Sequence, residues 1–202
     1  LLLKEMGWKI EKNPILINIL HPFNLIYDFI KNKISNKIVN KILEKIFLSL
    51  DYISSKFISL FHNKFDNVIA VNSFDENYND LLDIMNKSII YGVNLDDKYM
   101  NWRYIKKPNN NYKILSYVND GRVIGYLIYG TKKEFGTHIG YIMDIIADPN
   151  NKNVINSLIH CAKKELFQEG VTIISALSFK GNIFYQNLKG SGFFNAPKKF
   201  LP

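Results

Sequence analysis

The sequence predicts an α/β domain in residues 66–202, preceded by a helical segment. Three observations predict this fold class. Short runs of β-branched and aromatic residues alternate with amphipathic stretches of helical period. A glycine-containing turn joins two of these runs, as in a β-hairpin. A third run, His138 to Ala147, is apolar almost throughout, which is typical of a central strand buried on both faces.

Composition and charge narrow the class of protein. Of the 202 residues, 47% are hydrophobic and 22% charged, as in a packed domain rather than a disordered chain. The net charge is +8, and most of the excess lies before Asp66, so an anionic partner is a hypothesis for the N-terminal part. Cys161 is the only cysteine, which excludes an intramolecular disulfide and a thiolate zinc site. The four histidines lack metal-ligand spacing, and we expect no metal site.

The first residues have the pattern of the end of a domain. Leu1 to Ile10 has the pattern of a helix end, a glycine cap at Gly7 and a strand that begins with an aromatic residue. The same pattern occurs again at Leu188 to Phe194. Because one short element recurs at both ends, we expect residues 1–13 to be the tail of a preceding, related unit.

Residues 14–65 are expected to be a basic amphipathic helical linker. Apolar residues recur at three- to five-residue steps from Leu25 to Ile53. Lysines occupy other positions of the same stretch: Lys31, Lys33, Lys37, Lys41 and Lys45. One interpretation is a linker helix, or a bent pair, whose apolar face packs on the domains it joins. The alternative is a membrane-surface helix in residues 25–60, attracted to anionic lipid. We expect a cytoplasmic location, with a membrane-peripheral location as the alternative.

The expected elements of the domain follow in order. Strands are expected at Val68 to Val71, Tyr112 to Val118, Val123 to Tyr129, His138 to Ala147, Val171 to Leu177 and after Gly192. Helices are expected from Asp75 to Met85, from Asn94 to Tyr104, from Asn153 to Glu169 and through Phe184 and Leu188. Acidic residues open the first of these helices, and Gly170 ends the third.

Several segments resemble the GNAT superfamily of N-acyltransferases. Gly121 to Tyr126 resembles the family's hairpin, and Tyr141 to Pro149 its fourth strand. Asn182 to Phe193 resembles its closing helix and strand, and Lys98 to Tyr104 resembles the "WRy" text of a tandem-GNAT branch. The resemblance implies the GNAT acyl-CoA N-acyltransferase fold, with a mixed, mostly antiparallel sheet flanked by helices. Leu1 to Ile10 resembles the end of a preceding GNAT unit, which implies an N-terminal GNAT domain as a partner within the same chain.

The resemblance also implies binding of acetyl-CoA or another acyl-CoA. In the family, the fourth and fifth strands diverge, and the fourth strand pairs with the pantetheine arm. The residues in that position are Met143, Ile145 and Ala147. The pyrophosphate binds at the start of the following helix, where the helix dipole favours an anion. The residues in that position are Asn151, Lys152 and Asn153.

Two positions depart from the family pattern. The usual cofactor loop, R/Q-x-x-G-x-G/A, has glycines that let phosphate approach the backbone. The segment from Pro149 to Ser157 contains no glycine. The family's tyrosine commonly lies four residues before the glycine of its "GF" text. In this sequence that position is occupied by Leu188, and Tyr185 lies about one turn earlier.

Asp144 and Tyr185 are the candidate catalytic residues. Apolar neighbours would desolvate Asp144 and raise the pKa of its carboxyl, as suits a general base. The alternative for Asp144 is a buried ion pair with Arg103. Tyr185 would protonate the departing thiolate, or it is a helix residue whose hydroxyl faces water. Trp102, Arg103 and Tyr104 are candidate acceptor-binding residues, with packing as the alternative for the two aromatic side chains.

Three functions are compatible with these observations. The first is transfer of an acyl group from acyl-CoA to a small-molecule amine, such as an amino sugar or a cell-envelope precursor. The second is a catalytically degenerate GNAT module that supports an N-terminal GNAT domain. The third is an aminoacyl-tRNA-dependent transferase of the peptidoglycan-bridge type, whose linker lysines would contact phosphates. Outside this third hypothesis we do not expect a nucleic-acid partner.

Overall fold

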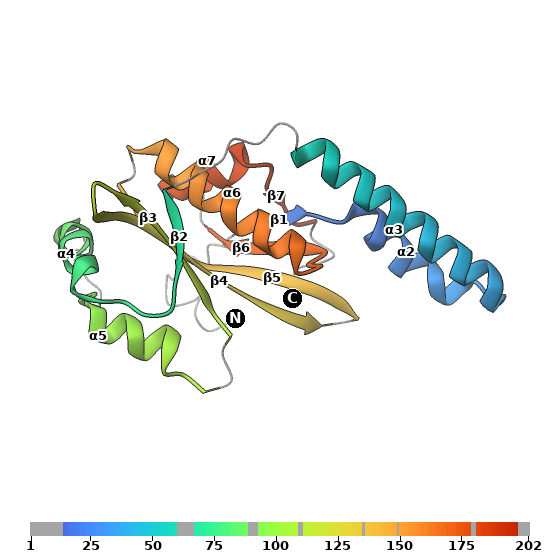
Figure 1. Ribbon diagram of the computed structural model, residues 1–202, viewed down its shortest axis with the longest axis horizontal. Coiled ribbons are helices and arrows are strands. Elements are labelled where there is room, and N and C mark those ends of the chain that lie inside the picture. Colours follow the sequence, from blue (N-terminus) through green and yellow to red (C-terminus); the bar gives the residue numbers. More distant parts are fainter. Residues whose placement is uncertain are drawn as a thin grey trace, which may run out of the picture.

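The computed structural model describes residues 14–59, 67–88, 93–108, 111–134, 136–148, 150–178 and 181–197. The expected tail in residues 1–13 lies outside them. Within the described residues, one mixed sheet has the strand order β2-β3-β4-β5-β6-β1-β7, and a helical hairpin projects from one end (Figure 1). The predicted fold class, a mostly antiparallel sheet flanked by helices, is confirmed.

The strands are β1 (Ile15–Ile19), β2 (Val68–Val71), β3 (Lys113–Asn119), β4 (Arg122–Glu134), β5 (Thr137–Ala147), β6 (Ile173–Leu177) and β7 (Phe194–Asn195). The helices are α2 (Pro22–Ile30), α3 (Lys37–Ser59), α4 (Asn79–Ser88), α5 (Asp97–Met100), α6 (Lys152–Gln168) and α7 (Ile183–Gly190). Short helical turns at Lys31–Lys33, Glu76–Tyr78 and Asn101–Ile105 extend or precede some of these helices.

The predicted hairpin joins β3 and β4. Asp120 and Gly121 both have positive φ, 49° and 75°, as a tight two-residue turn between twisted strands requires. The β5–β6 pair is parallel, whereas the neighbouring β4–β5 and β1–β6 pairs are antiparallel. β5 is therefore a central strand, in agreement with its apolar sequence.

Two apolar cores lie on opposite faces of the sheet. On one face, α6 and α7 cover side chains that include Leu127, Ile142 and Ile145. On the other face, α4, α5 and the adjoining turns pack around Tyr126 and Ile146. Residues of opposite parity along β4 and β5 thus face different helical layers, as the alternation of side chains along a strand dictates.

Strand β1 comes from the N-terminal part of the chain but lies between β6 and β7. Ile15 is paired with Leu177, and Ile17 is paired with Phe194 on the other side. Leu16 is fully buried in the core beneath α6 and α7. This corrects the predicted boundary of the linker, because Ile15–Ile19 belong to the sheet: their apolar, β-branched side chains complete the edge of β6.

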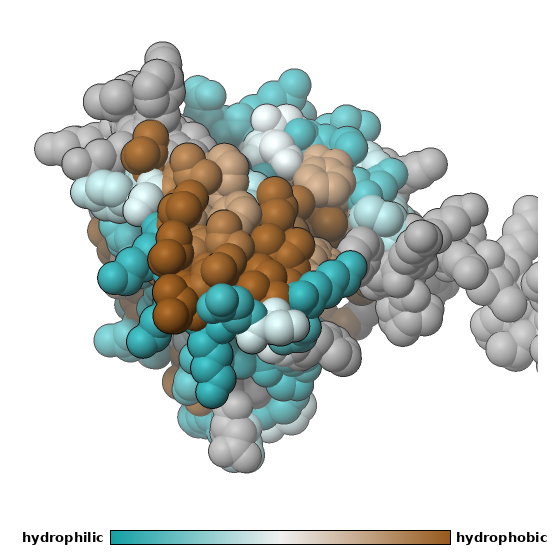
Figure 2. Space-filling view, turned by 90° about the vertical axis from the view of Figure 1, so that its right-hand side faces the viewer, coloured by the Kyte–Doolittle hydropathy of each residue, from teal (hydrophilic) through white to brown (hydrophobic). Residues whose placement is uncertain are grey.

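In its described part, the linker is helical over Pro22–Ile30, Lys31–Lys33 and Lys37–Ser59 and forms a bent pair, α2 and α3. The pair is joined by Tyr27, whose hydroxyl donates to Asn40 Oδ1 at 2.8 Å. The buried Asp51 of α3 accepts the backbone N–H groups of Phe23 and Asn24 at 3.1 and 2.8 Å, which stabilises the positive N-terminus of α2. Figure 2 shows a broad apolar patch on the side of the molecule from which this hairpin projects.

The start of α6 packs closely on β4 at Gly125. A Cβ atom at this position would lie 2.7 Å from Val154 Cγ1 and 3.0 Å from Ala147 Cβ. Such distances are shorter than van der Waals contact, so only glycine lets the first turn of α6 approach the end of β5 as it does here.

We therefore predict that Gly125→Ala destabilises the fold by about 1–3 kcal/mol, because the added methyl group overpacks this contact. The free energy of urea unfolding measures the effect. Gly190→Ala is the matched control, since a Cβ there meets no atom within 4 Å. Equal stabilities of the two variants would contradict the proposed close contact.

Candidate functional site

Strand β5 separates from β6 near its C-terminal end. The last parallel pair is Ile142 with Ala176, while β5 continues to Ala147. Beyond Ile142, the edge of β5 that faced β6 is not paired with it, so the backbone groups there can receive an extended ligand. Met143, Ile145 and Ala147, the predicted cofactor-binding residues, all lie in this diverging segment.

A β-bulge at Met143 sets the orientation of the segment. Ile128 is paired with Asp144 and Tyr129 with Ile142, which leaves Met143 as the extra residue. Ile142 and Ile145 both belong to the core beneath α6. The two residues between them therefore share the opposite face, and Asp144 is turned toward the layer that contains α5. Without the bulge, Asp144 would share the face of Ile142.

Asp144 accepts a hydrogen bond from the Tyr104 hydroxyl at 3.2 Å. Burial raises the pKa of the Asp144 carboxyl, while the Tyr104 hydrogen bond and the nearby Arg103 charge oppose that rise. Burial and the Asp144 charge raise the pKa of Tyr104, so the tyrosine keeps its proton and remains a donor. Asp144 is thus a desolvated carboxyl that accepts hydrogen bonds from the Tyr104 hydroxyl and the Ile145 backbone, and its role as a general base stays a prediction.

Arg103 does not form the ion pair that was the alternative interpretation of Asp144. Its guanidinium donates to the Tyr99 hydroxyl at 2.8 Å and lies over the Tyr104 ring, 5.2 Å from the centroid. Among the described side chains, the Tyr104 hydroxyl therefore connects this helical turn to Asp144 of β5, in place of the alternative ion pair with Arg103. Arg103 acts on Asp144 through its charge.

The helical turn at Asn101–Ile105 presents these residues to β5. Lys106 N–H donates to Asn101 O at 2.8 Å, a wide π-type turn of the kind often found at functional sites. The Asn101 side chain exchanges two hydrogen bonds with the backbone of Phe74, at 2.9 and 2.7 Å, which holds the turn against the preceding loop. The sequence predicted a helix here but not its wider turn.

A cavity of about 580 Å³ lies between this turn and β5. Tyr104, the partner of Asp144, and Met143, its chain neighbour, line the cavity, whereas Asp144 itself is not among the lining residues. The lining consists of Tyr99, Trp102, Arg103, Tyr104, Lys106, Lys107, Pro108, Tyr112 and Met143. All three predicted acceptor-binding residues therefore meet at one cavity, together with the bulged residue of β5. Lys106, Lys107 and Tyr112 were not predicted. Three cations and four aromatic rings in the lining favour a ligand that carries an anionic group and a ring or apolar part.

The loop before α6 satisfies many of its own backbone groups. Asp148 accepts the N–H of Asn150 with its side chain and that of Asn151 with its carbonyl, both at 2.9 Å. Asn150 O accepts Lys152 N–H at 3.1 Å, and Asn151 Oδ1 caps Val154 N–H at 3.4 Å. The predicted residues Asn151, Lys152 and Asn153 thus lie at the N-terminus of α6, but much of the hydrogen-bonding capacity of this loop is used internally.

Tyr185 lies in the core beneath α6 and not at the cavity. Its side chain is 7% exposed, and its hydroxyl donates to Asn195 Oδ1 at 3.1 Å. The alternative in which this hydroxyl faces water is therefore wrong, because α7 turns the residue inward beside Leu188. Tyr185 is not among the residues that line the cavity between the Asn101–Ile105 turn and β5.

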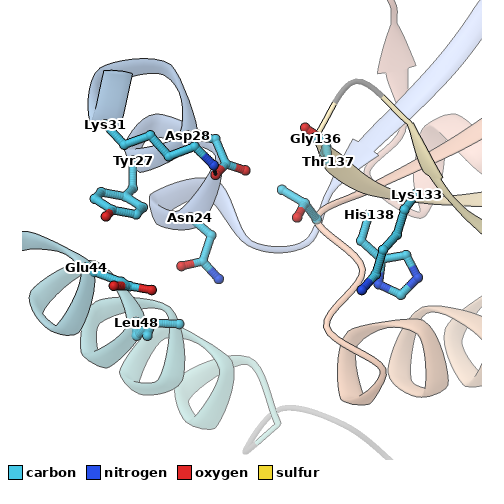
Figure 3. A pocket seen from close by; sticks show the side chains of 11 residues that line it. Asn24, Tyr27, Asp28, Lys31, Glu44, Leu48, Lys133, Gly136, Thr137 and His138 are labelled. Atoms are coloured by element: carbon cyan, nitrogen blue, oxygen red, sulfur yellow. Dashed lines mark hydrogen bonds and ion pairs between the residues drawn. The ribbon is translucent and has the colours of Figure 1, made fainter. Parts of the chain in front are cut away.

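A second cavity, of about 380 Å³, lies at the opposite end of β5, between the helical hairpin and the β4–β5 tip (Figure 3). His138, near the start of β5, lines it, whereas Asp144 is near the other end of the strand. None of the candidate site residues predicted from the sequence lines this cavity.

No group of three or more His, Cys, Asp or Glu side chains among the described residues is placed to hold a metal ion. None of the described helices combines the length and the apolar character needed to cross a membrane.

Comparisons with known proteins establish the fold. No protein-family model matches the chain, and no curated protein matches its sequence. Among solved structures, the chain is similar to a probable acetyltransferase, with a TM-score of 0.52 and 14% identity over 67% of this chain and 93% of that chain. It is also similar to the ribosomal-protein-alanine N-acetyltransferase from Brucella melitensis biovar Abortus 2308, with a TM-score of 0.51 and 12% identity over 64% and 92%. The chain thus has the fold of the GNAT acetyltransferases, as predicted.

The raised pKa of Asp144 predicts a pH dependence of stability. The unfolded carboxyl ionises near its ordinary value of 3.8, whereas the folded one keeps its proton to higher pH. The contribution of Asp144 to the free energy of unfolding is therefore full below that value and is lost as the pH rises through the folded pKa. Asp144→Asn cannot ionise, so its stability relative to the wild type should increase across this interval.

Chemical unfolding of both proteins over a pH series measures this difference. Tyr104→Phe is the matched control, because it removes the hydrogen bond that lowers the Asp144 pKa and should extend the interval to higher pH. Parallel stability curves for the wild type and Asp144→Asn would show that the carboxyl is not perturbed.

Proposed function

We propose that the chain is an acyltransferase that moves an acyl group from acyl-CoA to an amine. The observation that carries this proposal is the open edge of β5 after Ile142, next to a cavity that Met143 and Tyr104, the partner of Asp144, line. An extended ligand arm would add to this edge as a strand does, which suits the pantetheine part of CoA. The fold shared with acetyltransferases supports the proposal by analogy.

Each part of the site would have a separate role. When bound, acyl-CoA supplies a thioester whose acyl group is transferred to the amine. Backbone N–H groups of β5 near Met143 would polarise the thioester carbonyl. Asp144 would accept the proton of the attacking amine, directly or through a water molecule. The departing thiolate needs a proton, and Tyr185 could deliver it only after releasing Asn195, so water is the better donor in this geometry.

Tyr104 would position Asp144 in this mechanism. Its hydroxyl fixes one carboxylate oxygen and favours the ionised form, which is the form that accepts a proton. The base would still have a pKa above the ordinary value, because burial outweighs that hydrogen bond. Activity should therefore rise with pH as Asp144 loses its proton.

The acceptor would carry an anionic group as well as an amine. Arg103, Lys106 and Lys107 line the cavity, and no acidic side chain is among the lining residues. A planar guanidinium suits phosphate or carboxylate, and Trp102, which is 65% exposed, offers a flat face to a sugar ring. An amino sugar phosphate or a related cell-envelope precursor would satisfy both requirements.

The second candidate function is a catalytically degenerate module that supports another GNAT domain of the same chain. The internally bonded loop before α6 favours it, because four backbone N–H groups near the expected pyrophosphate position already have partners. The carboxylate of Asp148 in the same loop would also repel a phosphate. The two candidates differ in one measurable property, the binding of CoA.

We predict that acetyl-CoA binds the purified chain with micromolar affinity in isothermal titration. Lys152→Glu should weaken binding about ten-fold or more, because it reverses a charge at the α6 N-terminus. Lys164→Glu, the same change on an exposed residue near the other end of α6, is the matched control and should have little effect. Absence of binding at millimolar acetyl-CoA would reject the acyl-CoA enzyme and favour the degenerate module.

A thiol-release assay with acetyl-CoA and a panel of amino sugars and their phosphates tests the chemistry. Asp144→Asn should lower kcat by about 10²–10⁴-fold with little change in acetyl-CoA affinity, since it removes the proton acceptor and not the open edge of β5. Wild-type turnover by this variant would exclude Asp144 as the base.

A further inference from the structure

The helical hairpin turns its polar side toward its own domain. Asn24, Tyr27 and Asp28 of α2 and Glu44 of α3 line the second cavity, opposite Thr137 and His138 of the sheet. Figure 3 shows these side chains around the space between the hairpin and the β4–β5 tip. The side of the hairpin that faces the domain therefore carries polar side chains from both of its helices.

The opposite side of the hairpin is apolar and exposed. Residues four apart along a helix lie on one face, so Ile38, Ile42 and Ile46 form a row on α3, and they are 72%, 53% and 48% exposed. Ile26 and Phe29 of α2 are also about half exposed or more, at 49% and 59%. Together with Val39, Leu50 and Ile53, these residues define the outer face. Exposed apolar surface of this extent marks an interaction site.

A row of lysines borders the apolar row. Lys37, Lys41 and Lys45 are exposed and each precedes one of the three isoleucines, so the two rows run side by side along α3. The described acidic residues of the hairpin do not lie in this lysine row. Asp28 pairs with Lys31 at 2.7 Å, Asp51 is buried at the N-terminus of α2, and Glu44 lines the cavity.

This distribution of charge indicates which kind of partner binds the outer face. Pairing with a second copy would bring two lysine-bordered faces together, whereas Asp28 and Asp51 of the hairpin are already engaged and Glu44 faces the cavity. A bilayer that contains anionic lipid accepts apolar side chains at its interface and attracts the adjacent lysines. We propose that the α2–α3 hairpin is a peripheral membrane anchor, which lies in the interface of an anionic bilayer with its outer face toward the lipid.

Vesicle co-sedimentation of the full chain tests the anchor. The wild type should sediment with vesicles of equal parts phosphatidylcholine and phosphatidylglycerol, much less with phosphatidylcholine alone, and less at high salt. The double variant Lys41→Gln, Lys45→Gln should bind anionic vesicles about thirty-fold more weakly, as expected for two lysines near the surface. Ile42→Glu with Ile46→Glu should abolish binding.

Ile84→Glu is the matched control, because Ile84 on α4 is 62% exposed but lies outside the hairpin. It should bind as the wild type does, and circular dichroism verifies that each variant is folded. Failure of the wild type to bind anionic vesicles would overturn the proposal. Light scattering without lipid would then assign the face to a second copy, if the wild type is a dimer that Ile42→Glu with Ile46→Glu dissociates.

Discussion

The divergence of β5 from β6 is the constraint on which the candidate site depends. As long as the two strands are paired, β5 has no free edge, and its side chains belong to packed layers. After Ile142 the pairing ends, and the bulge at Met143 turns Asp144 away from the core beneath α6. Both the open backbone edge and the position of the carboxyl follow from this local change. The Tyr104 hydroxyl, which belongs to a residue of the cavity lining, then fixes Asp144.

Strand β6 is held in place from its other side by β1. Because β1 pairs with β6 along all five of its residues, β6 has a partner of its own where it leaves β5. The same strand leads directly into α2, whose N-terminus is fixed by Asp51. The proposed acyl-CoA site is therefore on β5, on one side of β6, and the proposed membrane anchor continues from β1, on the other side of β6.

Local patterns in the sequence predicted the fold class, the β3–β4 hairpin, the central strand and the amphipathic helices, because each depends on residues close together in the chain. The insertion of β1 was not predicted, since pairing of Ile15 with Leu177 depends on which distant strand has a free edge. At the site, the desolvated carboxyl of Asp144 was predicted from its apolar neighbours. Its partner was not, because the choice between Arg103 and Tyr104 depends on the wide turn at Asn101–Ile105 and on the bulge, neither of which has a marked sequence pattern.

Hydrogen exchange of the backbone amides with and without acetyl-CoA tests the central claim most directly. If the open edge of β5 receives the pantetheine arm, those amides of Met143 to Ala147 that point away from β4 should exchange more slowly in the presence of acetyl-CoA, because their N–H groups gain partners. The amides of β3, which are already paired with β2 and β4, should not change. Binding of acetyl-CoA that leaves the exchange of Met143 to Ala147 unchanged would contradict the account.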